Sequence, residues 1–278
     1  MTKSNPSTSR RLRVTGLELP VGDDLDRVRS LALEHLGLAP AELLHMRLIR
    51  KSLDLRGRRR GRAARWIVHV DVEIPLEAGG NKLERLIKSG KVKPAPASAS
   101  LEVADLHDDF RTSPARQAVV VGSGPGGVFA ALTLALAGVQ VKVLELGAEI
   151  SERSSLLAKF HNSRVVNPES NLLYGEGGAG TYSDGKLYTR VVDPLERNVL
   201  QELVRAGARE DILWEARAHI GTDRLHSVLP ALRERLIELG VEFLWNTRFE
   251  GLVTEAGNDR KLKGVRTSAG ELPCDGLV

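Results

Sequence analysis

The chemistry most clearly encoded in this chain lies in a group of glycines near residue 120. The stretch VVVGSGPGG, residues 119–127, places Gly122, Gly124 and Gly127 in the order Gly-x-Gly-x-x-Gly. Gly122 would make a tight turn after a strand, Gly124 would let the backbone approach a pyrophosphate, and Gly127 would let a helix pack closely. The N-terminus of that helix would offer free N–H groups and a positive dipole end to the phosphate. Because the pattern is short and glycine is common, its surroundings decide whether it binds a nucleotide.

The residues on both sides of the glycines match those of a nucleotide-binding site. The apolar run RQAVVV before the glycines predicts a strand, and residues 125–138 predict a helix that ends at Gly138. The next run, VQVKVLELG, predicts a second buried strand ending at Glu145, 18 positions after Gly127. An acidic side chain there can accept hydrogen bonds from ribose hydroxyls and would repel a 2′-phosphate. The unit of about 30 residues therefore predicts a dinucleotide site, although these residues alone do not choose between FAD and NAD.

A second glycine-rich stretch follows, NPESNLLYGEGGAGTYSDGKLYTR at residues 167–190. A simple NAD dehydrogenase would usually have a crossover helix and a third strand at this place. The stretch is either an ordinary surface loop or backbone that wraps around another part of a larger cofactor. Ordering five glycines within residues 175–185 without a ligand costs conformational entropy, which favours the cofactor. Asp184 and Lys186 would face flavin or substrate, or form an exposed turn pair.

These two stretches, together with HIGTDRLHSVLPALRERLIELGVEF, resemble a family of bacterial FAD-dependent dehydrogenases described as uncharacterised NAD(P)/FAD-dependent oxidoreductases. The family is similar in fold to the glutathione-reductase-type flavoproteins. The resemblance extends over the whole chain, and GEGGAGTYSDGKL is its most specific segment. It implies a FAD-dependent oxidoreductase that passes a hydride through bound flavin, with a small-molecule substrate and with NAD(P)H as a candidate reductant.

The resemblance also implies cofactor contacts, residue by residue. The FAD pyrophosphate would be held by Gly122, Ser123, Gly124, Pro125, Gly126 and Gly127, and the adenosine ribose by Glu145. The path toward the flavin would be lined by Gly177, Gly178, Gly180, Thr181 and Ser183. The backbone near Phe249 would contact the adenine. No catalytic residue is identified: His161 and His219 are acid–base candidates, with hydrogen-bonded structural histidines as the alternative.

Family relatives continue after CDGLV into a strand with an Ala-Thr-Gly-like turn and then a region that closes the flavin site. Because this chain ends at Val278, within that strand, we expect it to correspond to the N-terminal half of the family's length. A non-catalytic FAD-binding fragment is therefore an alternative to an active enzyme.

Composition limits the other possibilities. The chain has 278 residues, 42% of them hydrophobic and 27% charged, as expected of a globular protein. No run approaches 18 apolar residues and the N-terminus has no signal-like apolar segment, so we expect no membrane span and a cytoplasmic location. The single cysteine, Cys274, excludes an intramolecular disulfide, a redox cysteine pair and a cysteine zinc site, and we expect it in the core. No metal site is predicted.

Charge divides the chain. Residues 1–99 contain 20 Lys and Arg against 11 Asp and Glu, whereas the rest contains 20 against 25. The basic part predicts a βαββ-like module, and the Pro-, Ala- and Ser-rich residues 91–100 predict a linker. Its elements are expected at 11–17 (strand), 24–36 (helix), 43–55 and 65–74 (strands). The predicted domains are a basic α+β module (1–93), a linker (94–115) and a Rossmann-like FAD-binding domain (116–278), giving an α/β fold.

Within the second domain, we expect two further helices and three strands. Asp193-Pro194 would open a helix over 193–206 with Glu196 completing a capping box. The remaining elements are a helix at 222–239 that contains Pro230, a strand at 241–247, and a hairpin of 248–254 with 261–268.

An arginine run between the two strands of the basic module is the second chemical feature. Arg56, Arg58, Arg59, Arg60 and Arg62 lie in the turn, and Arg47, Arg50, Lys51 and Arg65 lie nearby. Such a finger would bind phosphates without reading sequence, which suggests an RNA-binding or RNA-modifying flavoprotein. The alternatives are an acidic partner, including the acidic half of this chain, and a solvated loop.

Overall fold

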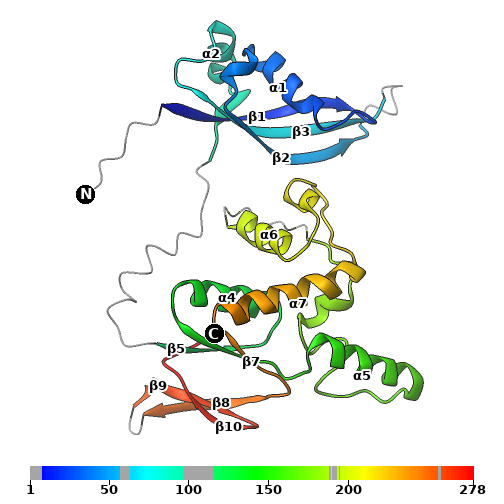
Figure 1. The fold of residues 1–278 in the computed structure, drawn as a ribbon, viewed down its shortest axis with the longest axis vertical. Coiled ribbons are helices and arrows are strands. Elements are labelled where there is room, and N and C mark those ends of the chain that lie inside the picture. Colours follow the sequence, from blue (N-terminus) through cyan, green and yellow to red (C-terminus); the bar gives the residue numbers. More distant parts are fainter. Residues whose placement is uncertain are drawn as a thin grey trace. The chain divides into compact units, whose positions relative to one another are not determined.

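The computed structural model describes residues 8–56, 63–96, 116–187, 189, 193, 195–255 and 258–278. Contacts divide the chain into two compact units. Residues 1–98 and Asp211–Ala218 form the N-terminal unit, and residues 99–210 and 219–278 form the C-terminal unit (Figure 1). Residues 97–115 of the predicted linker and Arg58, Arg59, Arg60 and Arg62 of the arginine run lie outside the described residues.

The N-terminal unit is an antiparallel sheet with two helices. Its elements are β1 (Ser9–Pro20), α1 (Arg27–Leu36), β2 (His45–Asp54), β3 (Arg65–Pro75), α2 (Asn81–Lys88) and β4 (Val92–Pro94). The strand order is β2-β3-β1-β4. This is the βαββαβ arrangement of a ferredoxin-like unit, which contains one helix and one strand more than the predicted βαββ pattern.

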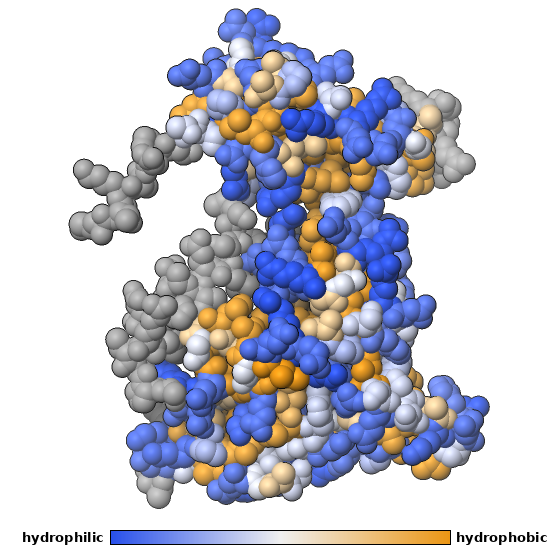
Figure 2. All heavy atoms as spheres, viewed as in Figure 1, coloured by the Kyte–Doolittle hydropathy of each residue, from blue (hydrophilic) through white to orange (hydrophobic). Residues whose placement is uncertain are grey.

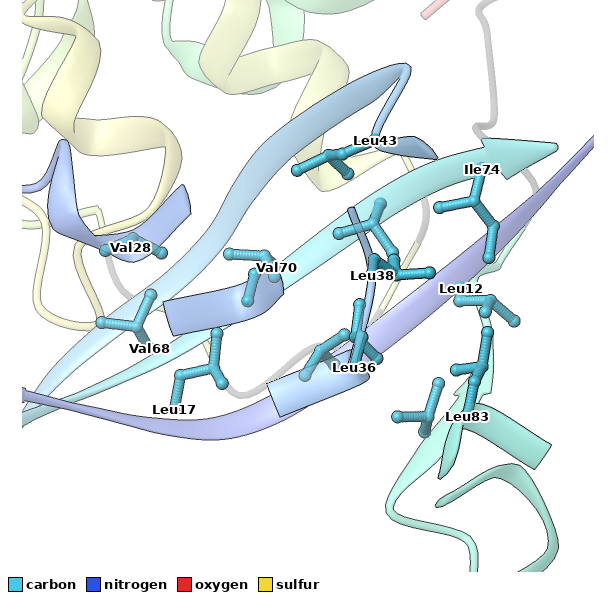
Figure 3. Close-up of a cluster of buried hydrophobic side chains, with 14 of the residues drawn as sticks. Leu12, Leu17, Val28, Leu36, Leu38, Leu43, Val68, Val70, Ile74 and Leu83 are labelled. Carbon is cyan, nitrogen blue, oxygen red and sulfur yellow. The ribbon is translucent and has the colours of Figure 1, made fainter. Parts of the chain in front are cut away.

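Alternation in the strands explains the core of this unit. Every second residue of β3 from Val68 to Ile74 is at most 1% exposed, and α1 buries Val28, Ala32 and Leu36 against the sheet. Figure 3 shows Val68, Val70 and Ile74 of β3 and Val28 and Leu36 of α1 in one apolar cluster with Leu12, Leu17 and Leu83. Gly37, with φ 72°, ends α1 as the sequence predicts, because its N–H donates to the Leu33 carbonyl in a left-handed cap.

Two features of this unit depart from the sequence-based expectation. Val92–Pro94, at the start of the stretch interpreted as a linker, forms strand β4, because Val92 is buried beside β1 and an edge strand tolerates proline. Residues 211–218 join the unit at the edge of β2, where the Lys51 N–H donates to the Trp214 carbonyl (2.7 Å). The Lys51 Nζ atom also lies 2.8 Å from a carboxylate oxygen of Glu215.

The C-terminal unit contains a parallel sheet in the order β11-β5-β6-β7. The strands are β5 (Gln117–Val121), β6 (Gln140–Leu144), β7 (Glu242–Leu244) and β11 (Gly276–Leu277). The helices are α4 (Pro125–Leu136), α5 (Ile150–Ser163), α6 (Glu196–Arg205) and α7 (Thr222–Glu238). The chain proceeds outward from β5 to β7 and then returns to the other side of β5. In open α/β sheets, ligands bind beyond the carboxyl ends of the strands at such a switch point.

A second, antiparallel sheet in the order β10-β9-β8 packs on this unit. It consists of β8 (Phe249–Glu255), β9 (Asn258–Thr267) and β10 (Gly270–Pro273). The predicted hairpin is therefore confirmed and extended by a third strand. Val265 and the buried Cys274 pack against Val119 and Leu144, so one apolar cluster joins the two sheets.

Three element predictions need correction. Helix α5 was not expected at all, and β7 is shorter than the predicted strand 241–247. Helix α6 begins at Glu196 with Leu195 as its N-cap, so the predicted capping box does not form. The reason is local, because the Asp193 carboxylate accepts a hydrogen bond from the Leu195 N–H (2.7 Å) in a turn that precedes the helix.

The surface of both units mixes hydrophilic and apolar residues (Figure 2), as is usual for folded proteins. None of the helices in the described part of the chain has the length and apolar character needed to cross a bilayer.

Candidate functional site

The first glycine turn has the geometry that its sequence predicts. Gly122 follows β5 with φ 98°, a left-handed conformation that favours glycine, and its N–H donates to the Leu144 carbonyl (2.7 Å). Gly124 is the N-cap of α4. A Cβ atom on Gly127 would lie 1.9 Å from the Gly122 carbonyl oxygen, so only glycine lets α4 approach the turn this closely.

The space in front of this turn fits a phosphate. A Cβ atom added to Gly124 or to Gly126 would meet no atom within 4 Å. The N–H groups in the first turn of an α-helix have no partner inside the helix, and Pro125 occupies the N1 position, where an N–H is dispensable. The turn therefore combines hydrogen-bond donors, the positive end of the α4 dipole and room for an anion.

Glu145 connects this turn to the second glycine-rich stretch. Its side chain is buried, and Oε2 accepts hydrogen bonds from the Ser123 N–H (2.8 Å) and the Ser123 hydroxyl (2.7 Å). Oε1 accepts hydrogen bonds from the Gly147 N–H (2.9 Å) and the Gly175 N–H (3.0 Å). These four bonds use the full acceptor capacity of a carboxylate. The residue predicted to hold a ribose thus also holds the two glycine segments together.

The second glycine-rich stretch lies directly against the first. The Gly177 N–H donates to the Ser123 carbonyl (3.1 Å), and a Cβ atom on Gly178 would lie 3.5 Å from Gly124 Cα. Gly175, Gly177 and Gly178 all have φ between 67° and 116°, which explains the density of glycine here. The structure therefore brings together the predicted residues Ser123, Gly124, Gly177 and Gly178.

The remaining residues of this stretch differ in exposure. Thr181 is buried, and its hydroxyl donates to the Glu176 carbonyl (2.7 Å). Gly180 and Ser183 are exposed, and the Ser183 hydroxyl donates to the Gly180 carbonyl (2.7 Å). The Asp184 and Lys186 side chains are both more than half exposed and form an ion pair at 3.0 Å, which matches the exposed-turn interpretation.

Arg153, on α5, is a positioning residue that sequence reasoning missed. It is fully buried, and its Nε donates to the Asn171 carbonyl (2.8 Å). Its Nη1 donates to the Glu176 carbonyl (2.6 Å) and the Thr181 hydroxyl (3.2 Å). The guanidinium carbon also lies 5.0 Å from the centre of the Tyr182 ring. Burial lowers the pKa of Arg153. This side chain cross-links the second glycine stretch and so fixes the surface that faces the first turn.

A buried ion pair supports the same stretch from α7. The Glu176 carboxylate accepts hydrogen bonds from the Ile150 N–H (2.8 Å) and from Arg233 Nη1 (2.9 Å). Arg233 also contacts Glu149 at 2.9 Å. Burial raises the pKa of Glu176, while the Ile150 N–H and the Arg233 charge act in the opposite direction. Three elements, α5, α7 and the stretch itself, therefore share one polar network.

The other site candidates lie elsewhere in the fold. Phe249 is the first residue of β8, and its side chain packs against the apolar cluster between the two sheets. The proposed adenine contact at Phe249 involves the backbone and stays a prediction. His161 is exposed near the end of α5 beside Phe160, and His219 is exposed in a bridge with Lys186.

Arg56 of the arginine run and two basic residues near the run pair with acidic residues of their own unit. Arg56 contacts Asp54 at 2.9 Å, Arg65 pairs with Glu18, and Arg47 contacts Asp71 at 3.0 Å.

No protein-family model matches the chain. An uncharacterised protein of Clostridium beijerinckii is 32% identical over 267 residues, and the match covers 96% of this chain and 48% of that protein. The chain therefore spans about half the length of the curated relative that it matches.

Solved structures of low sequence identity are also similar. THI4 of Thermovibrio ammonificans has 13% identity and a TM-score of 0.38, with 63% of this chain and 60% of that chain covered. A GidA-related protein of Thermus thermophilus has 19% identity and a TM-score of 0.33, with 59% and 52% covered. A ferredoxin reductase of Rhodopseudomonas palustris has 18% identity and a TM-score of 0.29, with 59% and 23% covered. At these identities the similarity concerns the fold alone.

Proposed function

We propose that this chain binds FAD and forms the flavin-binding part of an oxidoreductase. One observation carries the proposal: two glycine segments meet at the carboxyl end of β5, and the buried Glu145 accepts hydrogen bonds from both. A site for a nicotinamide dinucleotide needs only the first segment. The second segment, held by Arg153 and by the Glu176–Arg233 pair, supplies backbone for a longer ligand.

Different residues would hold different parts of FAD. Gly122–Gly127 would hold the pyrophosphate at the start of α4, and Glu145 would hold the adenosine ribose. Gly177, Gly178, Gly180, Thr181 and Ser183 would line the path toward the flavin. When bound, FAD supplies the redox chemistry by accepting a hydride or electrons, and the protein contributes binding, orientation and exclusion of water.

Ser123 gives Glu145 a way to accept the ribose. All four acceptor positions of the carboxylate are used, so a ribose hydroxyl must replace one of the present donors. Three of these donors are backbone N–H groups, whereas the fourth is the Ser123 hydroxyl, which can turn away by rotation about χ1 alone. We therefore propose that the Ser123 hydroxyl gives up its hydrogen bond to Glu145 when a ribose hydroxyl binds there.

The test is the visible absorption spectrum of the purified chain titrated with FAD, with NAD⁺ as the competing ligand. We expect a change in the flavin bands, relative to free FAD, that saturates as FAD is added. An equal concentration of NAD⁺ should not reverse this change. Displacement by NAD⁺ at equal concentration would overturn the FAD assignment in favour of a nicotinamide site.

A second step separates an enzyme from a binding fragment. NAD(P)H is added to the FAD-loaded chain without oxygen, and bleaching of the flavin is followed. Bleaching supports NAD(P)H as the reductant. An unbleached flavin that dithionite does reduce would show FAD binding without this activity in the present chain.

A further inference from the structure

The N-terminal sheet has one face that its helices leave open. Helices α1 and α2 cover the face that carries Val68, Val70 and Val72. The alternate residues of β3, which include His69 and Asp71, point to the other face. Residues directly opposite each other in an antiparallel pair share a face, so the strand register identifies the rest of this surface.

That register places a row of cations across the sheet. Asp71 on β3 lies opposite both Arg47 on β2 and Arg13 on β1, and Arg13 lies opposite Lys93 on β4. Neighbouring rows add Arg50, opposite His69, and Arg11, opposite Glu73. These three rows carry five arginine or lysine side chains against two carboxylates, and further along the strands the same face also carries Glu18, Asp54 and Arg65. We call this surface the basic sheet face.

The two carboxylates do not neutralise these charges. Asp71 accepts two hydrogen bonds from Arg13 (2.7 and 2.9 Å) and one from Arg47 (3.0 Å), so one negative charge faces two guanidinium groups. Arg50 and Lys93 are exposed and make no ion pair within the described residues. Burial is the main cause that lowers the pKa of His69, and the charges of Arg50 and Arg13 act in the same direction.

We propose that the basic sheet face binds the phosphate backbone of single-stranded RNA, a function beyond the proposed flavin site. Neighbouring strands lie about 4.8 Å apart, so the row from Arg47 to Lys93 presents its charges along a line of about 14 Å, as a linear polyanion requires. The centre of the face, at Arg13, His69 and Asp71, is polar or charged, whereas protein interfaces usually have an apolar or aromatic centre, which disfavours an acidic protein as the partner. The described strands of this sheet carry no Phe or Tyr, and Trp66 lies on the covered face, so the contacts are mainly to phosphates and carry little sequence preference.

The experiment measures binding of fluorescein-labelled oligouridine to the full chain by anisotropy over a range of salt concentrations. The test variant is Arg50→Gln/Lys93→Gln, because both side chains are exposed and unpaired by acidic groups of the described chain. The control variant, Arg85→Gln/Lys88→Gln, removes the same charge from exposed positions of α2 on the covered side of the sheet. The logarithm of the association constant falls as the logarithm of the salt concentration rises. Loss of two phosphate contacts should make this slope less steep by about 1.4, whereas the control should keep the wild-type slope.

Two further readouts identify the ligand and the surface. Polyglutamate of equal charge should compete weakly, and equal competition would overturn the RNA assignment in favour of an acidic protein. The pKa of His69, measured by NMR, should rise when oligouridine binds, because phosphates offset the charges of Arg50 and Arg13. An unchanged salt slope in the test variant, or an unchanged pKa of His69, would overturn the proposal. FAD titration of the same variants should match the wild type, so this test is independent of the flavin site.

Discussion

The packing of α4 against the glycine turn predicts a large effect of one methyl group. In Gly127→Ala, the new Cβ atom would lie 1.9 Å from the Gly122 carbonyl oxygen, 3.1 Å from the carbonyl carbon and 3.3 Å from Val120 Cγ1. An ordinary contact begins at 3.4 Å, so the turn and the helix must separate by about 1.5 Å. Both sides of this contact are backbone, and no side-chain rotation can relieve it.

The loss of stability depends on the packing that is disturbed when α4 moves away from the glycine turn. Helix α4 buries Val128, Ala131 and Leu132, and β5 is an inner strand of the parallel sheet. Overpacking of a well-packed site usually costs about 1–3 kcal/mol, and a clash between two backbone segments belongs at the upper end of that range. We therefore expect Gly127→Ala to lower the free energy of unfolding by about 3 kcal/mol.

Urea denaturation followed by circular dichroism measures this change, and Gly126→Ala is the matched control. The control adds the same methyl group one residue earlier in the same helix, where it meets no atom within 4 Å. Because alanine is the better helix former, Gly126→Ala should leave stability unchanged or raise it by up to about 1 kcal/mol. Equal stability of Gly127→Ala and the wild type, or an equal loss in both variants, would refute the packing account.

Three further predictions concern buried polar groups. Burial acts to raise the pKa of Asp71, but hydrogen bonds from Arg13 and Arg47 lower it overall. The ionised Asp71 therefore stabilises the fold fully above the ordinary aspartate pKa, and this stabilisation is lost as the pH falls through the pKa of Asp71 in the folded protein. Urea unfolding should accordingly show that Asp71→Asn costs about 1–3 kcal/mol at pH 7 and less in acid; a pH-independent cost would contradict this. Arg153→Met should cost about 2 kcal/mol in urea and expose the second glycine stretch to proteolysis, because it leaves the part-buried Asn171 carbonyl without its donor and the buried Glu176 carbonyl with the Thr181 hydroxyl alone; a protease-resistant stretch would contradict the positioning role. Burial raises the pKa of the Cys274 thiol, so Ellman's reagent should react slowly with the folded chain and fast in urea; fast reaction of the folded chain would place the thiol at the surface.

Local patterns were sufficient to predict most of the elements. The alternation of β3, the Gly37 cap and the βαβ unit around Gly122 all depend on neighbouring residues, and the structure contains each of them. The role of Gly127 was also predictable, because the glycine pattern implies a close helix.

Helix α5 shows why other elements were missed. Its buried positions are Ile150, Arg153 and Leu157, which have helical spacing. The middle position is an arginine, however, and a search for apolar periodicity counts it as polar. Arg153 can be buried because carbonyls of a distant glycine stretch accept hydrogen bonds from its guanidinium group. The local sequence around Arg153 does not reveal these hydrogen bonds.

Long-range pairing explains the remaining differences. Strand β4 is recognisable only once β1 lies beside it, and residues 211–218 reach Lys51 across more than 160 positions of sequence. The four donors to Glu145 likewise come from three separate segments. The sequence predicted the type of residue at this place, while its hydrogen bonds depend on the tertiary fold.

The most direct test of the central claim is the dissociation constant of FAD for the wild-type chain and for Gly124→Val. The new side chain meets no protein atom at its Cβ, and φ at this position is −69°, so the fold should persist, which circular dichroism can verify. The valine would occupy the space assigned to the pyrophosphate and remove about two charge-assisted hydrogen bonds, each worth about 1.5–3 kcal/mol. We predict affinity for FAD weaker by on the order of a hundredfold or more. Equal affinity of a folded Gly124→Val variant would contradict a pyrophosphate site at this turn.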